Sequence, residues 1–173
     1  RRTRMQHLTD ARPNPFVRVA GQTLLDAVLD NALNAGVQNV VVNVCYLGDQ
    51  IERALAPRPI PIHFSREETA LETGGGIQKA LPYLCQNGGA DGFFALNADT
   101  LWDDKTLSVF DRLRAAWNPQ HMDALLALIP IENTFGDVND GNYFLETVLP
   151  RRQKSGVPQI LFVFMGVQTL HPR

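Results

Sequence analysis

Three consecutive glycines within the segment Leu71–Ile77 stand where a helix is expected to begin. Glycine has no Cβ, so the backbone there can approach a flat or anionic ligand closely, and the entropic cost of three in a row favours such a role over a plain flexible loop. The alternative is a loop in which Thr73 is the helix N-cap. The segment is not a G-x-G-x-x-G dinucleotide fingerprint, because Gln78 and Lys79 occupy the later positions. We therefore predict that it binds a nucleotide, and that Lys79 is a solvated helix residue rather than a phosphate ligand.

A carboxylate follows the apolar run Phe93–Asn97, which is typical of a buried strand. Such a strand would deliver Asp99 to the carboxyl edge of its sheet. Carboxylate oxygens bind Mg²⁺, usually one or two per ion with phosphates completing the coordination shell. We therefore predict Asp99 as a metal ligand, with helix capping as the alternative. The later pair Asp103 and Asp104 is expected to cap the next helix.

Predicted helices and strands, which could position these residues, alternate along the chain. Apolar residues at helical spacing predict helices, and β-branched or apolar runs predict strands. The predicted helices are Leu24–Ala35, Tyr46–Leu55, a helix from the glycine segment to about Leu84, and Thr106–Trp117; the predicted strands are Val40–Val44, Ile60–Phe64, Phe93–Asn97 and Asp123–Ile129.

This alternation predicts an α/β fold with a mostly parallel sheet and helices on both faces. Ligands of such sheets lie beyond the carboxyl ends of the strands, where Asn43 and Asp99 would both point. After Pro130 the alternation stops, and Tyr143–Val148 and Ile160–Val167 favour a hairpin or an antiparallel addition. At 173 residues the chain is expected to be a single domain, 1–173.

Composition argues against several classes of protein. The formal net charge is −2 and there is no run of Lys and Arg, so the composition does not indicate a basic surface for binding nucleic acid. No apolar run approaches the ~20 residues of a membrane span. The cysteines, Cys45 and Cys85, have no C-x-x-C spacing, which favours a reducing, cytoplasmic setting. The histidines are scattered, so we expect no zinc site, and no serine has the context of a hydrolase nucleophile.

The order of several short motifs is similar to that of one enzyme family. The motifs are T-R-M-x-x-L-T from Thr3, P-x-P-F from Pro13, V-A-G-x-x-L-L from Val19, L-E-T-G-G-G-I from Leu71 and N-x-D from Asn97. Together they resemble the nucleoside-triphosphate:sugar-1-phosphate nucleotidyltransferases, and the N-acetylmuramate-1-phosphate uridylyltransferases of peptidoglycan recycling in particular. The resemblance covers almost the whole chain.

The resemblance implies a Rossmann-like three-layer fold that transfers a nucleoside monophosphate, UMP from UTP, to a sugar 1-phosphate with Mg²⁺ and releases pyrophosphate. It implies catalytic roles for Arg4 and Asp99, with Asp99 holding the metal. The implied nucleotide-binding residues are Thr3, Arg4, Glu72, Thr73, Gly74, Gly75 and Asn97, and the implied sugar-binding residues are Asn142, Tyr143 and Gly166.

Some positions differ from the family pattern. Asn14 stands where the family has a lysine near the phosphates, and Asn142 stands where an acidic residue is expected. The family's first strand and its C-terminal part are expected to be missing from these 173 residues. A second hypothesis therefore remains open: a divergent, catalytically impaired module that binds nucleotide or a protein partner. The sequence does not indicate an oligomeric state.

Overall fold

A computed structural model describes residues 14–103, 108–135, 143–146, 149–152 and 161–173. Its first elements are the 3₁₀ turn η2 (Asn14–Phe16), β1 (Arg18–Val19), β2 (Gln22–Thr23), α1 (Leu24–Asn34), β3 (Val40–Val44), α2 (Gly48–Leu55), β4 (Ile62–Arg66) and α3 (Glu72–Gln86). They are followed by β5 (Phe93–Leu96), α4 (Val109–Ala116), β6 (Ala124–Pro130), the turn η3 (Ile131–Asn133), β7 (Tyr143–Glu146), β8 (Leu149–Arg152) and β9 (Phe162–Leu170).

Local chemistry explains where the helices begin and end. Thr23 is the N-cap of α1, since its hydroxyl oxygen accepts a hydrogen bond from the Asp26 N–H at 3.0 Å. Past the end of α1, Gly36 has a φ of +78°, which a glycine adopts without a Cβ penalty. Ser108 caps α4, its oxygen accepting from the Phe110 N–H at 3.2 Å. The expectation that Asp103 and Asp104 would cap this helix is therefore wrong.

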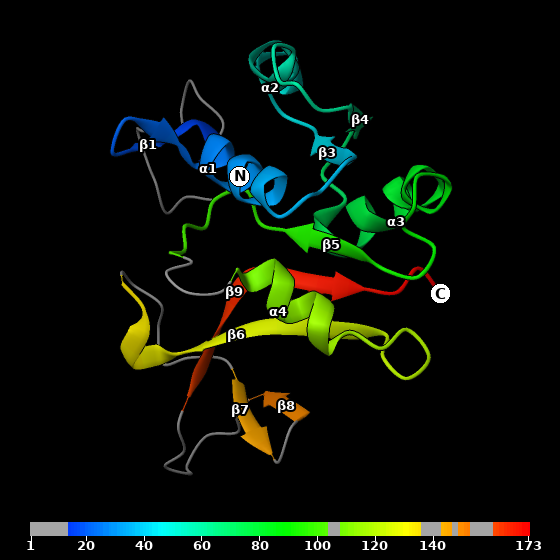
Figure 1. Ribbon diagram of the computed structural model, residues 1–173. Helices are drawn as coiled ribbons and strands as arrows, with labels where there is room; N and C mark the ends of the chain where they lie inside the picture. Colours follow the sequence, from blue (N-terminus) through cyan, green and yellow to red (C-terminus); the bar gives the residue numbers. More distant parts are fainter. Residues whose placement is uncertain (1–13, 104–107, 136–142, 147–148, 153–160) are drawn as a thin grey trace.

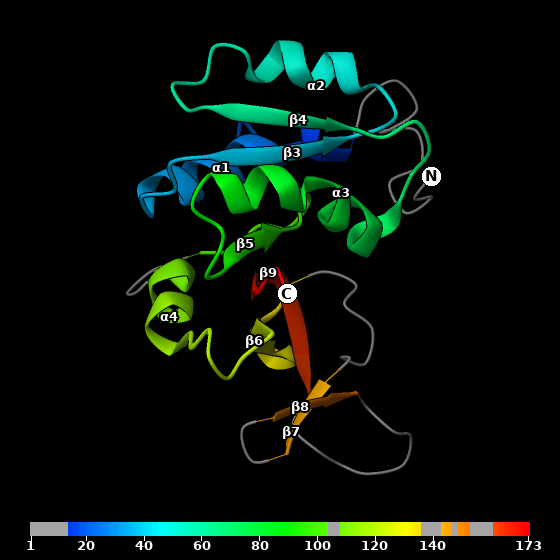
Figure 2. The ribbon, with the colours of Figure 1, turned by 90° about the vertical axis from the view of Figure 1, so that its right-hand side faces the viewer.

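The strands form two main sheets. β3 and β4 pair in parallel, with Val40 opposite Ile62 and Val44 opposite Arg66. In the second sheet β9 lies between β5 and β6 and is antiparallel to both, and the β7–β8 hairpin joins at the Phe162 end of β9. Figure 1 shows β9 beside β5 and β6, and Figure 2 shows the hairpin at the opposite end of the molecule from β3 and β4.

The directions of the strands fit the expected α/β class. β5 and β6 run in the same direction, because each is antiparallel to β9. Ala98, just after β5, packs in the same apolar cluster as Val44 at the end of β3, so the carboxyl ends of these two strands lie together. The predicted pattern of parallel strands is thus interrupted by β9, which inserts antiparallel between β5 and β6.

Two apolar clusters stabilise the fold. One gathers around β3, α1 and α2 and contains Leu25, Leu29, Val44, Ile51 and Leu55. The other gathers around α4, β6 and β9 and contains Ala32, Val109, Phe110, Leu113, Ala127 and Val167. Helix α1 supplies residues to both clusters, so it connects the two halves of the molecule.

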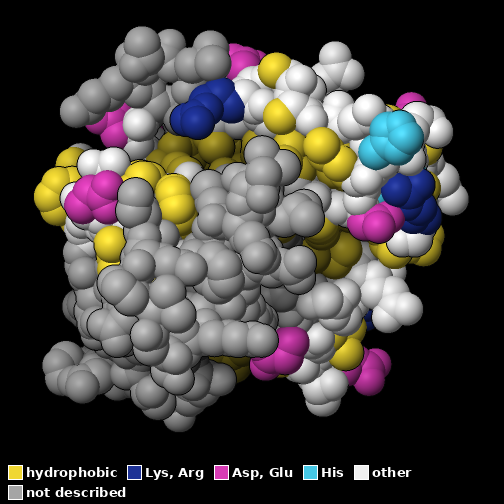
Figure 3. Space-filling model, turned by 90° about the horizontal axis from the view of Figure 1, so that it is seen from below, with side chains coloured by type: hydrophobic (Ala, Val, Ile, Leu, Met, Phe, Trp, Pro, Cys, Tyr) yellow, Lys and Arg dark blue, Asp and Glu magenta, His cyan; other side chains and the backbone are white. Residues whose placement is uncertain are grey.

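The surface and the helices add two observations. On the face drawn in Figure 3, charged side chains of both signs are interspersed with apolar ones among the coloured residues. Within the described ranges, no helix combines the length and the apolar character needed to cross a membrane.

Candidate functional site

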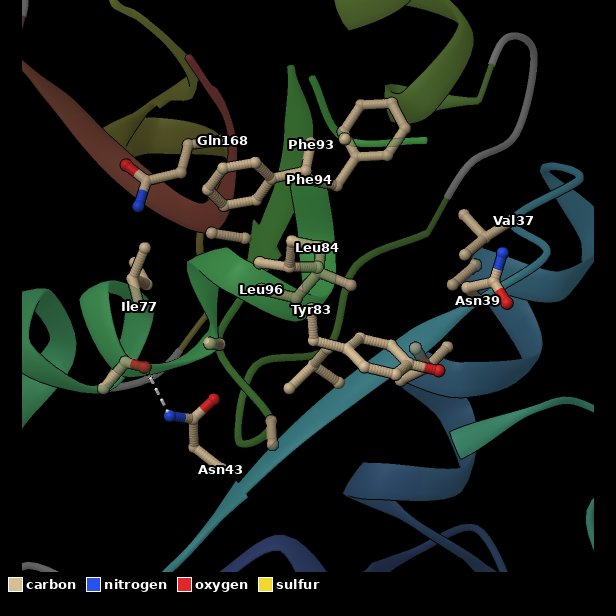
Figure 4. A pocket seen from close by; sticks show the side chains of 18 of the residues that line it. Val37, Asn39, Asn43, Ile77, Tyr83, Leu84, Phe93, Phe94, Leu96 and Gln168 are labelled. Carbon is tan, nitrogen blue, oxygen red and sulfur yellow. Dashed lines mark hydrogen bonds between the residues drawn. The ribbon is translucent and has the colours of Figure 1, made fainter. Parts of the chain in front are cut away.

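A pocket of about 660 Å³ lies between β3 and β5, and residues of α1 and α3 also line it. At one end it reaches the carboxyl ends of the two strands, where Asn43, Glu67, Glu72, Thr73 and Asp99 are among its lining residues. Figure 4 shows Asn43 on β3 facing the start of α3, with Phe93, Phe94 and Leu96 of β5 across the pocket. The fold therefore brings the glycine segment and Asp99 to one edge, as the sequence predicted.

A side-chain amide fixes the start of α3 to β3. The Asn43 amide donates to the Gly76 carbonyl oxygen at 2.8 Å and to Glu67 Oε1 at 3.0 Å. The other Glu67 oxygen, Oε2, accepts from the Leu71 N–H at 3.0 Å. Helix α3 has no side-chain cap at Leu71, so the Glu67 carboxylate satisfies one of its free N–H groups instead. Thr73 is not the N-cap.

The three glycines lie in the first turns of α3 and have different surroundings. A Cβ at Gly76 would lie 2.8 Å from both Asn43 Nδ2 and Glu67 Oε1, and one at Gly75 would lie 2.9 Å from Leu71 Cβ. A Cβ at Gly74 would meet no atom within 4 Å. Gly75 and Gly76 are therefore required by packing, whereas Gly74 faces open space and is available to a ligand.

Glu72 begins α3 with a φ of +58°, which is uncommon for a residue with a side chain. Glu72, Thr73 and Gly74 are all exposed. Glu72 and Thr73 line the pocket, and Gly74 is exposed beside them. The structure thus places the four predicted base-binding residues, Glu72 to Gly75, on one continuous turn of backbone.

Asn97 and Asp99 follow β5 in a turn and are half-buried. The Asn97 N–H donates to the Gly166 carbonyl oxygen on β9 at 2.7 Å. Gly166 has a φ of +75°, and a Cβ there would lie 2.9 Å from Asn97 Cβ and 3.0 Å from Thr100 Oγ1. Gly166, predicted for the sugar side, therefore lies against the turn that carries Asn97 and leads to Asp99.

The donor atoms at this edge allow a test of the expected Mg²⁺. Among the described residues, no group of three or more His, Cys, Asp or Glu side chains could enclose a metal ion. Mg²⁺, however, is commonly held by one or two carboxylates together with substrate phosphates. The Asp99 carboxylate, with the Asn97 amide on the same turn, fits that arrangement but supplies no complete protein cage.

Positive charge is scarce at the edge. Among the described residues that line the pocket, Arg114 is the one basic side chain, and it lies over the Phe94 ring at 5.3 Å from the ring centroid. Lys79 donates to the Arg66 carbonyl oxygen, outside the pocket. Hydrogen bonds to Asp49 and Glu52 raise the pKa of Arg66 and hold its guanidinium on α2. The described part of the pocket therefore offers an anion little positive side-chain charge.

Among the described residues, the predicted sugar-binding residue Tyr143 does not lie at this edge. Tyr143 is the first residue of β7 and pairs with Phe162, four positions along β9 from Gly166, a separation of ~13 Å at about 3.3 Å per residue. Thr3, Arg4 and Asn142 lie outside the described residues.

Glu67 lines the pocket but is not among the residues that the sequence predicted for it. It directly follows β4, as Asn43 lies near the end of β3, and the carboxyl ends of parallel strands share one edge. Its position directly after Arg66, the last residue of β4, could have indicated that it lies at this edge.

A pocket at the carboxyl edge of parallel strands, bordered by a glycine-containing helix start and an Asp, defines a nucleotide-binding α/β protein. The model of the MobA-like NTP transferase domain matches residues 2–133, so the chain belongs to that family of nucleotidyltransferases.

Sequence relatives support the same class. The chain is 37% identical over 178 aligned residues to the N-acetylmuramate alpha-1-phosphate uridylyltransferase of Caulobacter vibrioides, an alignment covering 98% of this chain and 71% of that protein. It is 38% identical to the enzyme of the same name from Neisseria meningitidis, over 78% of this chain and 58% of the relative. The expected sugar-1-phosphate nucleotidyltransferase family, and with it an enzyme of that kind, is confirmed.

The fold recurs in a solved structure of UDP-glucose pyrophosphorylase complexed with UDP-glucose. The TM-score is 0.70 at 16% identity, covering 98% of this chain and 72% of that one. This similarity confirms the Rossmann-like α/β fold class.

Proposed function

We propose that this chain carries the active site of a uridylyltransferase that moves UMP from UTP to N-acetylmuramate 1-phosphate and releases pyrophosphate. The observation that carries the proposal is the convergence of the exposed start of α3 and Asp99 on one pocket edge. The choice of uridine and of the sugar is supported by the 37% identity to the Caulobacter vibrioides enzyme.

In this proposal the start of α3 binds the base. The N–H groups in the first turn of a helix lack intrahelical partners and are free to bind a ligand. Gly74 leaves the space in which a flat ring could lie against that backbone. The Asn43–Glu67 hydrogen bonds hold the turn in place before substrate arrives, which lowers the ordering cost of binding.

Asp99 and Asn97 serve the reacting phosphates. A sugar phosphate oxygen attacks the α-phosphorus in line, the bond to the pyrophosphate oxygen breaks, and no covalent enzyme intermediate is required. Mg²⁺, when bound at Asp99, supplies charge neutralisation at the phosphates. Gly166 holds the turn through its hydrogen bond with Asn97, so Asp99 keeps a fixed position. Arg4 supplies a further positive charge.

The test compares two Asp→Asn substitutions at opposite ends of β5. Asp99→Asn removes the proposed metal ligand while preserving shape, and Asp91→Asn changes an exposed carboxylate before the strand. We expect Asp99→Asn to lower Mg²⁺-dependent UDP-sugar formation by about 100-fold or more and Asp91→Asn to leave it nearly unchanged. Equal rates in both variants, each with an unchanged thermal midpoint, would remove Asp99 from the mechanism.

The second candidate is a catalytically impaired module that keeps nucleotide binding. It is favoured by Asn14, which is half-buried in η2 with its carbonyl oxygen accepting from Val17 N–H at 3.1 Å. An amide there cannot replace a lysine's charge. Asn14→Lys separates the hypotheses: a gain in turnover of ~10-fold or more supports impairment, and no gain supports a competent site.

We also propose a cytoplasmic location and Mg²⁺ as the cofactor. The location is supported by Cys45 and Cys85, both free and exposed, since such thiols persist in reducing compartments.

A further inference from the structure

The turn that carries Asp99 runs from Asn97 to Trp102 and connects β5 with the segment before α4. It begins with the hydrogen bond from the Asn97 N–H to the Gly166 carbonyl oxygen, at 2.7 Å. Ala98 then packs against the apolar cluster around β3. On its N-terminal side, Asp99 is therefore fixed by one hydrogen bond and one apolar contact.

Trp102 provides an apolar contact on the C-terminal side of Asp99. Its indole ring lies 6.3 Å from the ring of Phe110 on α4, centroid to centroid, at an angle of 57°. Phe110 is 0% exposed, and its ring meets that of Phe94 on β5 edge-on at 5.0 Å. Trp102 thus packs on the cluster around α4 and is connected through Phe110 to the strand that Asp99 follows.

The immediate neighbours of Trp102 do not share this packing. Leu101 is 44% exposed and Asp103 is also exposed, whereas Trp102 is half-buried. Among the described residues between the turn and the start of α4, Trp102 is therefore the one that connects the chain to the core.

The indole ring also borders open space. Together with Ala27 and Asn31 of α1, it lines a second pocket of about 410 Å³. A smaller side chain at this position would enlarge an existing pocket rather than leave a sealed cavity in the core. Substitutions of Trp102 should therefore fold and act mainly on the turn.

We propose that Trp102 is a positioning residue for Asp99. It fixes the C-terminal end of the turn on α4, as the Asn97–Gly166 hydrogen bond fixes the N-terminal end, and so holds the Asp99 carboxylate at the pocket edge. The inference rests on the proposed function, in which Asp99 holds Mg²⁺. A ligand side chain that is already fixed loses less conformational entropy when the metal binds, and groups that orient metal ligands change metal affinity by ~10–100-fold.

The chain contains two tryptophans, and the second one offers a matched control. Trp117, at the end of α4, donates from Nε1 to the Asp91 carbonyl oxygen at 2.8 Å. Its ring also lies against Gly92, where a Cβ would be 2.7 Å from Nε1. Trp117 is thus bound just before the amino end of β5, whereas Trp102 follows its carboxyl end.

The first measurement is native-state amide hydrogen exchange without metal or nucleotide. The N–H groups of Asn97 and Gly92 both donate to backbone carbonyl oxygens and report on the two ends of β5. Trp102→Ala should speed exchange at Asn97 about tenfold and leave Gly92 unchanged, and Trp117→Ala should do the reverse. Each rate is compared with that of the Val40 N–H, which is hydrogen-bonded at the start of β3 and reports on overall stability.

The second measurement is the Mg²⁺ concentration that gives half-maximal UDP-sugar formation. Trp102→Ala should raise it about tenfold, with a smaller change in KM for the sugar phosphate, and Trp117→Ala should leave it nearly unchanged. Trp102→Phe keeps a ring against Phe110 and should return the Mg²⁺ requirement to within about threefold of the parent value.

Two results would overturn the proposal. One is unchanged exchange at Asn97 in Trp102→Ala. The other is an equal rise in the Mg²⁺ requirement for Trp102→Ala and Trp117→Ala, which would make the role of Trp102 merely structural. If Trp102→Ala does not fold, Trp102→Leu, which keeps apolar bulk without a ring, takes its place in both measurements.

Asp99→Asn separates this inference from the proposed function. Full Mg²⁺-dependent turnover in that variant would overturn the proposed function, and with it the role of Trp102 toward the metal. The exchange rates, measured without metal, would still decide whether Trp102 holds the turn.

Discussion

At the scale of single residues, Gly74 and Gly76 differ only in what surrounds them, which allows a matched test. A Cβ at Gly76 meets two polar atoms at 2.8 Å, whereas one at Gly74 meets none. We expect Gly76→Ala to lower the free energy of unfolding by ~1–3 kcal/mol through overpacking. Gly74→Ala should raise it by ~0.5–1 kcal/mol, since alanine loses less entropy in a helix. Urea unfolding measures both.

The Gly74→Ala substitution also tests where the base of the nucleotide binds. If the base lies over Gly74, Gly74→Ala should weaken UTP binding although it stabilises the fold. Calorimetric titration that finds unchanged affinity in this stabilised variant would place the base elsewhere.

Gly166 and Gly36 form a second matched pair, because their φ angles are +75° and +78°. Alanine at Gly36 meets no atom within 4 Å, so Gly36→Ala should show the backbone cost alone, ~1–2 kcal/mol. Gly166→Ala adds contacts with Asn97 and Thr100 and should cost ~1–3 kcal/mol more. It should also raise KM for nucleotide by displacing Asn97. Equal losses of stability in thermal unfolding would contradict the close approach of β9 to this turn.

At the scale of elements, Arg58 links the segment before β4 to α1 by ion pairs with Asp26 and Asp30. Burial raises the pKa of Asp26, but hydrogen bonds from Thr23 and Arg58 and the charge of Arg58 outweigh it, so this pKa is lowered. A lowered carboxyl pKa stabilises the fold above the unfolded value of about 3.9, and the stabilisation is lost as pH falls through the folded value.

We therefore expect Arg58→Met to cost ~1–2 kcal/mol at about pH 7, a modest value because the pair is partly exposed. The difference from the parent protein should shrink below about pH 4. Arg173→Met, which breaks the more exposed pair with Asp123, should cost under ~1 kcal/mol. Urea unfolding across this pH range checks the sign, and a cost of Arg58→Met that grows in acid would contradict it.

The elements also show how far the sequence alone could reach. Val40–Val44 was predicted with its observed bounds, because an unbroken β-branched run is a local signal. The antiparallel place of β9 between β5 and β6 depends on pairing across more than 30 residues, which no local period encodes. The residues of the candidate site likewise divide into those that local sequence predicts and those that it does not. The glycine segment and Asp99 were predicted from their own residue types, and both lie at the pocket edge. Glu67 was not predicted, because its hydrogen bonds are to partners that only folding brings to it.

At the scale of the whole molecule, two apolar clusters share α1, and residues of both line the pocket between β3 and β5. Leu55 lies in the cluster around β3 and is 2% exposed, and Leu113 lies in the cluster around β9 and is 5% exposed. No described strand pairs β3 with β5, and α1 is the helix that supplies residues to both clusters. Such weakly coupled parts can open as separate cooperative units.

The matched substitutions Leu55→Ala and Leu113→Ala test this coupling, each removing the same side chain at a cost of ~2–5 kcal/mol. In native-state hydrogen exchange, Leu55→Ala should speed exchange mainly in β3 and β4, and Leu113→Ala mainly in β5, β6 and β9. If either substitution alone speeds exchange equally throughout, the two halves unfold as one unit, and the packing of α1 in both clusters is sufficient to couple them.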